Sequence, residues 1–105
     1  MNTKHWYKEF EEIIDGEEWL PLKSFKHYYI SNLGRIKKGN KILSQEFDED
    51  LNLVATVKNK KYTVKLRIDR LVIKYFLPNF FKQLKFKHVS TDKLDNTVWN
   101  LEWCD

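Results

Sequence analysis

The sequence predicts an α+β domain built from small antiparallel strands and hairpins with two or three short helices. Short apolar runs with two-residue alternation, separated by polar turns, fill the middle of the chain. Helical periodicity appears only near the N-terminus and again from Asp69. The 105 residues are 42% hydrophobic, which is enough for one compact unit with a core. We divide the chain into an N-terminal helical segment, residues 1–16, and two further segments, 17–50 and 51–105.

The N-terminal segment has the spacing of a short amphipathic helix over residues 4–14. Asp15-Gly16 ends this helix because glycine breaks the pattern. Residues 1–22 carry six acids against two lysines, so we do not expect the helix to face nucleic acid. Its apolar side chains are Trp6, Phe10, Ile13 and Ile14.

The second segment is predicted to form short strands joined by tight turns. Asn32 and Gly34 tolerate positive φ, and the Ser31 hydroxyl can bond the turn backbone. Pro21 and the surrounding aromatic residues favour a short extended piece before the first of these strands. We expect strands near residues 27–30, 35–37 and 42–43, with turns at 31–34 and 38–41.

The third segment begins with a predicted antiparallel hairpin. Residues 51–57 form an apolar β-prone run, 58–61 a polar turn, and 62–68 an alternating strand with a basic outer face. A helix then follows, with Asp69 as its predicted N-cap and Pro78 close to its end.

Charge is distributed in blocks, although the net charge is only +4. Residues 23–43 carry six basic residues and no acid, and residues 52–88 carry ten basic residues against Asp69 alone. Residues 44–51 carry four acids and no base. The basic blocks favour a polyanionic partner, because neutralising phosphates releases counterions.

The run Ser-Asn-Leu-Gly-Arg-Ile at 31–36 is the most distinctive stretch of the second segment. With its flanks, residues 17–43 resemble the NUMOD4 motif of endonucleases from phages and mobile elements. The positions that carry this resemblance are Glu17, Trp19, Pro21, Phe25, Tyr29, Ser31, Asn32, Gly34, Arg35, Ile36, Ile42 and Leu43.

Two further runs resemble the HNH domain that follows NUMOD4 in homing endonucleases. They are I-D-R-L-V-I-K-Y-F-L-P-N at 68–79 and K-H-V-S-T-D-K-L-D-N-T-V-W-N-L-E-W at 87–103. The resemblance implies a ββα-metal fold in which His88 is the general base and a divalent ion stabilises the scissile phosphate. The final helix of that fold would lie beyond Asp105, so we expect the C-terminal part to be incomplete.

Several site positions depart from the HNH pattern. Lys87 stands where the family has a metal ligand, and an ammonium group cannot coordinate a cation. Asp69 replaces a histidine, while Ser90 and Thr91 replace an Asp-Gly pair. We therefore predict no metal ligands and no cofactor, with Mg²⁺ or Mn²⁺ required only if His88 is catalytically active.

Asn96 and Asn100 match asparagines of the HNH pattern. We interpret both as residues that hold turns by bonding local backbone. Asp92, Asp95 and Glu102 lie nearby, but their spacing fits no metal motif, so we interpret them as exposed loop acids.

The function favoured by the sequence is that of a catalytically inactive DNA-binding protein derived from an HNH endonuclease of a phage or mobile element. Basic side chains would then contact the phosphate backbone. The predicted nucleic-acid-binding residues are Arg35, Lys37, Lys38, Lys41, Lys58, Lys60, Lys61, Lys65, Arg67 and Lys87.

Two alternatives stay open. The chain could inhibit a host defence nuclease or CRISPR effector, with acidic side chains mimicking nucleic acid, or it could be an active HNH nuclease or nickase that uses His88. The predicted partner-binding residues of the inhibitor hypothesis are Glu11, Glu12, Glu46, Asp48, Glu49 and Asp50.

The cellular setting follows from what the sequence contains. Cys104 is the one cysteine, which rules out an intramolecular disulfide and fits a reducing compartment. There is no signal peptide and no apolar run near 18 residues, so we expect no membrane partner and a location in the host cytoplasm. The oligomeric state is left open.

Overall fold

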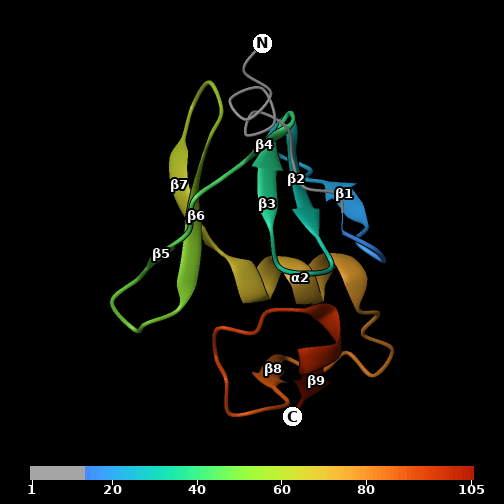
Figure 1. The fold of residues 1–105 in the computed structure, drawn as a ribbon. Coiled ribbons are helices and arrows are strands. Elements are labelled where there is room, and N and C mark those ends of the chain that lie inside the picture. Colours follow the sequence, from blue (N-terminus) through green and yellow to red (C-terminus); the bar gives the residue numbers. More distant parts are fainter. Residues whose placement is uncertain (1–13) are drawn as a thin grey trace.

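The computed structural model describes residues 14–105, so most of the helix predicted over residues 4–14 lies outside the described part. Three small antiparallel sheets surround one α-helix, α2 (Figure 1). This arrangement confirms the predicted α+β class. The first sheet contains β1 (Trp19–Pro21), β2 (Tyr28–Ser31), β3 (Ile36–Lys38) and β4 (Lys41–Ile42) in that order.

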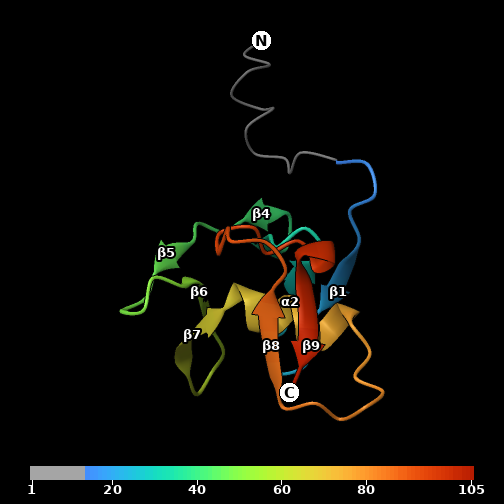
Figure 2. The same cartoon turned by 90° about the horizontal axis from the view of Figure 1, so that it is seen from below.

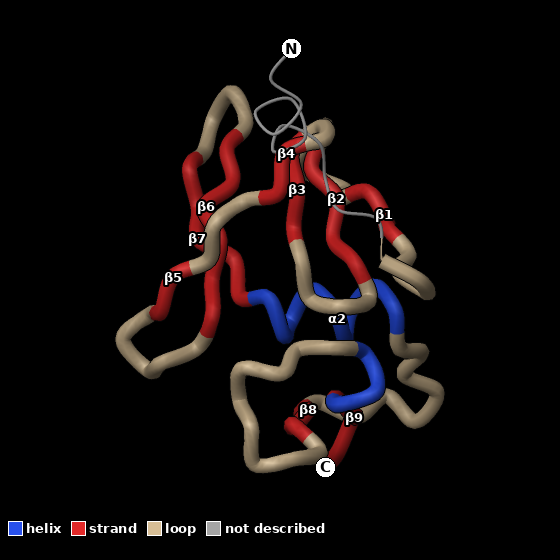
Figure 3. The backbone as a smooth tube through the Cα atoms, in the orientation of Figure 1, coloured by secondary structure: helices blue, strands red, loops and turns tan. Residues whose placement is uncertain are grey.

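The second sheet and the C-terminal pair follow in chain order. The tube in Figure 3 shows them on different sides of the helix. The second sheet contains β5 (Glu46–Phe47), β6 (Leu53–Lys58) and β7 (Thr63–Arg67), and α2 spans Ile68–Phe76. The last sheet pairs β8 (Lys85–His88) with β9 (Leu101–Cys104), and the 3₁₀ helix η1 (Val98–Asn100) leads into β9.

The start of α2 corrects one prediction. Asp69 is not the N-cap, because the helix already begins at Ile68 and Arg67 occupies the capping position without a side-chain cap bond. Ile68 is fully buried and shares a helix face with Leu71 and Val72, so the apolar spacing recruits it into the helix. Asp69 instead lies in the first turn, where its carboxylate accepts two hydrogen bonds from Arg67.

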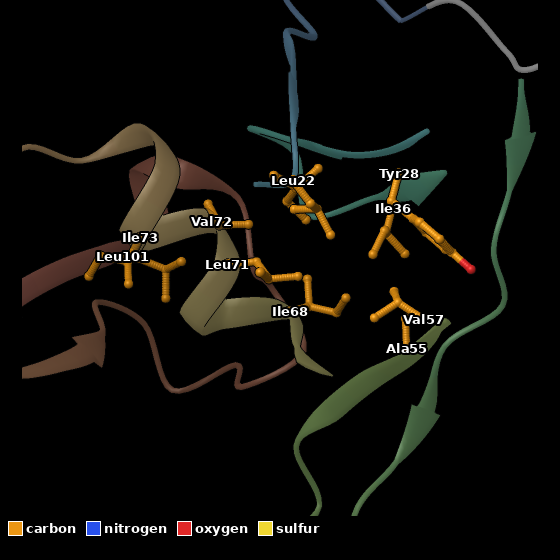
Figure 4. Close-up of a cluster of buried hydrophobic side chains, with 11 residues drawn as sticks. Leu22, Tyr28, Ile36, Ala55, Val57, Ile68, Leu71, Val72, Ile73 and Leu101 are labelled. Atoms are coloured by element: carbon orange, nitrogen blue, oxygen red, sulfur yellow. The ribbon is translucent and has the colours of Figure 1, made fainter. Parts of the chain in front are cut away.

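The hydrophobic core is centred on α2, as the close-up in Figure 4 shows. Each sheet contributes buried side chains that pack with the helix in one cluster, so the sheets hold the helix in a single orientation. The core is formed by Leu22, Tyr28, Ile30 and Ile36 from the first sheet region, Ala55 and Val57 from β6, Ile68, Leu71, Val72 and Ile73 from α2, and Leu101 from β9.

The turn between β2 and β3 is built by its own polar side chains. Ser31 Oγ accepts the backbone N–H groups of Leu33 and Arg35 at 3.2 and 3.1 Å. Gly34 has φ of 82°, as predicted, since only glycine adopts this conformation without strain. Asn32 does not have positive φ; its side chain instead accepts the N–H of residue 18 and donates to the carbonyl of residue 16.

A bidentate ion pair ties this turn to the chain before β1. Arg35 donates through two nitrogens to the Glu17 carboxylate, whose side chain is only 3% exposed. Burial opposes ionisation of Glu17, but hydrogen bonds from Arg35 and Ser31 outweigh it and lower the pKa of the carboxyl group. The ion pair therefore stabilises the fold only while Glu17 is ionised.

We predict that Glu17→Gln lowers the free energy of unfolding by roughly 1–3 kcal/mol at pH 7, because Arg35 loses its charged acceptors. Since the folded pKa is below the ordinary value of 4.5, this stabilisation is complete above that value and is lost as the pH falls through the folded pKa. Urea titrations between pH 7 and pH 3 should show the two proteins converging. Glu46→Gln, in the exposed pair with Lys65, is the control and should change stability little.

Candidate nucleic-acid interface

An open hollow of about 650 Å³ lies beside His88, between β8, the start of α2 and the turn after β5. We call it the His88 hollow. Figure 2 shows β8 and β9 lying across α2, which brings these elements together. The hollow is lined by Asp50, Asn52, Arg67, Asp69, Arg70, Leu84, Lys85, Phe86, His88 and Lys93.

The lining of the His88 hollow is predominantly cationic. Asp69 is almost fully buried and binds Arg67 at 3.0 and 2.7 Å, and this hydrogen bonding raises the pKa of the guanidinium further. Arg70, Lys85 and Lys93 are exposed at its rim. Because Asp69 neutralises Arg67, the exposed cations supply the positive field that an anion would meet.

The His88 ring forms a hydrogen bond with the side chain of Asn96. Its Nε2 lies 2.7 Å from Asn96 Oδ1, and Asn96 is buried. An amide oxygen only accepts hydrogen bonds, so Nε2 carries the proton in the neutral ring and Nδ1 keeps a lone pair. Asn96 therefore positions the histidine, and our interpretation of it as a residue that bonds local backbone is wrong.

Asn100 does hold local backbone, as predicted. Its Oδ1 accepts the N–H of Ser90 at 2.9 Å, and its Nδ2 donates to the carbonyl of Asp95 at 2.8 Å. Its backbone carbonyl accepts the N–H of Val89 at 2.8 Å. These bonds close the 89–100 loop over the end of β8 and give Asn96 a defined place.

The 89–100 loop rests on the β2–β3 turn. Val98 donates its N–H to the carbonyl of Asn32 at 2.8 Å. A Cβ on Gly34 would lie 3.0 Å from the Asn96 carbonyl oxygen and 3.1 Å from its Cβ. The turn that carries the NUMOD4-like signature thus supports the residue that positions His88.

A second basic hollow, of about 470 Å³, lies at the far end of the β6–β7 hairpin from α2. We call it the lysine hollow. No acidic side chain is among its lining residues, and four of its five lysines were predicted to bind nucleic acid. It is lined by Ser24, Lys26, His27, Lys38, Lys58, Asn59, Lys60 and Lys61.

The other predicted nucleic-acid-binding residues are mostly engaged within the protein. Arg35 binds Glu17, and Lys37 lies 4.3 Å from the ring of Trp19. Exposed Lys41 lies in β4 and lines neither hollow.

Two more predicted lysines form exposed cross-strand ion pairs. Lys65 pairs with Glu46 at 2.8 Å. Lys87 pairs at 3.3 Å with Glu102, its direct partner in the β8–β9 register. Lys87 does not line the His88 hollow.

Two of the acidic residues of the inhibitor hypothesis, Glu46 and Asp48, have partners within the protein. Glu46 binds Lys65, and Asp48 accepts the backbone N–H groups of Asn52 and Asp50, which lower its pKa. Asp50 faces the His88 hollow and Glu49 is exposed. Glu11 and Glu12 lie outside the described residues.

Across residues 14–105 no three histidine, cysteine or acidic side chains come close enough to hold an ion. The described residues also contain no helix long and apolar enough to span a membrane.

Comparisons with known proteins identify the family of this chain. The model of the NUMOD4 motif matches residues 17–70. Two proteins of Acanthamoeba polyphaga mimivirus, both called uncharacterized HNH endonucleases, are similar: L245 is 31% identical over 87 residues, and L247 is 35% identical over 94 residues. These matches cover 81% and 84% of this chain, but only 26% and 24% of the two viral proteins.

The fold is also similar to that of a solved HNH endonuclease structure. The HNH homing endonuclease I-HmuI, in a structure titled for DNA binding and cleavage, superposes with a TM-score of 0.72 at 26% identity. The match covers 83% of this chain and 52% of that one. Fold and sequence together define an HNH endonuclease-like protein. The chain belongs to the NUMOD4 family.

We predict that Gly34→Ala destabilises the protein more than Gly39→Ala. Both glycines have positive φ, which costs an alanine about 1–2 kcal/mol. A Cβ at Gly39 meets nothing within 4 Å, whereas at Gly34 it meets Asn96 and adds roughly 1–3 kcal/mol of overpacking. Urea denaturation measures both.

NMR of the His88 ring provides a second measurement on the Gly34→Ala and Gly39→Ala variants. Gly34→Ala should shift the His88 imidazole resonances because Asn96 is displaced, and Gly39→Ala should leave them in place. Equal destabilisation with unchanged His88 signals in both variants would show that the turn does not position the site.

Proposed function

We propose that this chain binds double-stranded DNA through the His88 hollow. The observation that carries the proposal is the meeting of Arg70, Lys85 and Lys93 around one hollow, from an α-helix, a strand and a loop. A phosphate group entering the hollow would displace counterions and gain charge-assisted hydrogen bonds. The relatives named as HNH endonucleases support this choice of polyanion.

The lysine hollow extends the proposed interface. The β6–β7 hairpin connects the two hollows, since Arg67 lies at its α2 end and Lys58 at its turn. Two cationic hollows separated by a hairpin suit an extended polyanion better than a small anion, because each hollow can contact a different stretch of the phosphate backbone. Metal is not required for this contact, so binding should persist in a chelator.

We predict that Arg70→Gln weakens binding to a duplex of about 20 base pairs several-fold and lowers the slope of log K against log salt by about one unit. Fluorescence anisotropy at several salt concentrations, with EDTA present, measures both. Lys23→Gln is the control, because Lys23 is exposed but lines neither hollow. No retention of duplex by the unaltered protein at low salt would refute DNA binding.

A second candidate function is strand cleavage with His88 as general base. The favouring observation is the hydrogen bond that His88 Nε2 donates to Asn96 Oδ1. This bond leaves Nδ1 of the same ring, which lines the His88 hollow, able to accept a proton. The described residues do not complete a metal shell, so we assign no step to an ion. The sequence-based prediction of inactivity stays a prediction.

Plasmid nicking with Mg²⁺ or Mn²⁺ tests the second candidate. If His88 is the base, His88→Ala should reduce nicking by about 100-fold or more while duplex binding is kept. Nicking that survives His88→Ala, or is absent from the unaltered protein, would dismiss cleavage and leave DNA binding standing.

Inhibition of a host nuclease or CRISPR effector has weaker support. Acidic mimicry requires carboxylates that face outward as a group, but Glu46 and Asp48 are bonded within the protein and Asp50 faces a cationic hollow. We therefore place DNA binding ahead of it.

A further inference from the structure

The loop between α2 and β8 displays three large apolar side chains to solvent. Phe80, Phe81 and Leu84 are 84%, 86% and 93% exposed, although phenylalanine and leucine are among the residues most often buried. Folding alone does not account for this display, because hydrophobic burial would favour turning such side chains inward. A cluster of this kind commonly marks a contact surface.

The loop has a defined backbone. Asn79 closes it by accepting the N–H of Gln83 at 2.9 Å and donating to its carbonyl at 2.7 Å. Trp103 Nε1 donates to the carbonyl of Leu77 at 3.0 Å and so fastens the start of the loop to β9. Little conformational entropy therefore remains to be lost when the displayed side chains bind a partner.

The charge around the loop indicates the kind of partner. No acidic residue occurs between Arg70 and Thr91, while Lys82 and Lys85 are exposed beside the aromatic pair. Leu84 and Lys85 also line the His88 hollow, so the apolar cluster continues directly into the cationic surface. Figure 2 shows the loop running from the end of α2 to the start of β8.

Aromatic rings interleaved with cations fit nucleic acid better than a purely apolar protein surface. Each nucleobase has a π-face on which phenylalanine stacks, and neighbouring lysines neutralise the flanking phosphates. Exposed Phe and Leu side chains also enter between base pairs as wedges and kink the duplex.

From these observations we infer that Phe80 and Phe81 form an apolar wedge that opens a base step of DNA held in the His88 hollow. Leu84 would fill the space between the wedge and the hollow. The inference rests on the proposed DNA binding and adds to it a distortion of the duplex. The hydrogen bonds of Asn79 and Trp103 hold the loop that carries these rings next to Lys85.

Duplexes carrying 2-aminopurine at successive positions test the wedge, because the fluorescence of this base rises when it is unstacked. The unaltered protein should raise it, and Phe80→Ser/Phe81→Ser should abolish the rise and weaken binding by roughly fivefold or more. The salt slope should not change, because no phosphate contact is removed. Phe81→Trp, which still stacks, should retain the signal.

Trp99→Ser is the matched control. Trp99 is 65% exposed and lines neither hollow, so its loss should leave binding and fluorescence unchanged. If the unaltered protein binds DNA but the serine variants bind and unstack it equally well, the wedge is refuted and DNA binding stands. If those variants instead abolish self-association in sedimentation runs without affecting DNA, the loop is a protein contact. No DNA binding by any variant refutes the proposed function itself.

Discussion

The contact between the β2–β3 turn and the 89–100 loop is the interaction on which the rest of the site depends. The side-chain oxygen of Asn32 accepts the backbone N–H of Glu18, and its backbone carbonyl accepts the N–H of Val98. Gly34, which has no side chain, leaves room for Asn96. Asn96 in turn orients His88. Asn32 and Asn96 are buried, so the loss of one hydrogen-bond partner leaves a buried polar group unsatisfied, and the cost is that of a network rather than of one bond.

Electrostatics separates residues that build the fold from residues available to a ligand. Glu17–Arg35 and Arg67–Asp69 each pair a nearly buried carboxylate with a half-buried guanidinium, and such pairs act mainly within the structure. Exposed cations differ from these paired ones, because only water screens their charge until a polyanion displaces that water. Arg70, Lys85 and Lys93 are of this second kind, and the proposed interface depends on them.

Local pattern predicted the fold class, the strands of the middle segment and the helix at 68–76, because alternation and helical spacing are properties of neighbouring residues. It failed at the start of α2, where burial of Ile68 overrode Asp69 as a cap. It also did not single out Lys26, Arg70, Lys85 and Lys93, which line the two hollows, because no local motif marks any of them. The charge blocks that contain the first three were the one available signal.

By itself the sequence determined the family, the fold class and the abundance of positive charge, since motifs, periodicity and composition are all readable along the chain. Only the tertiary structure decided which cations face a common hollow and which are neutralised by a carboxylate. It also decided that Asn96 serves His88. The physical reason is that electrostatic and hydrogen-bond partnerships act across space, often between residues distant in the sequence such as Arg35 and Glu17, and depend on how α2 brings three sheets together.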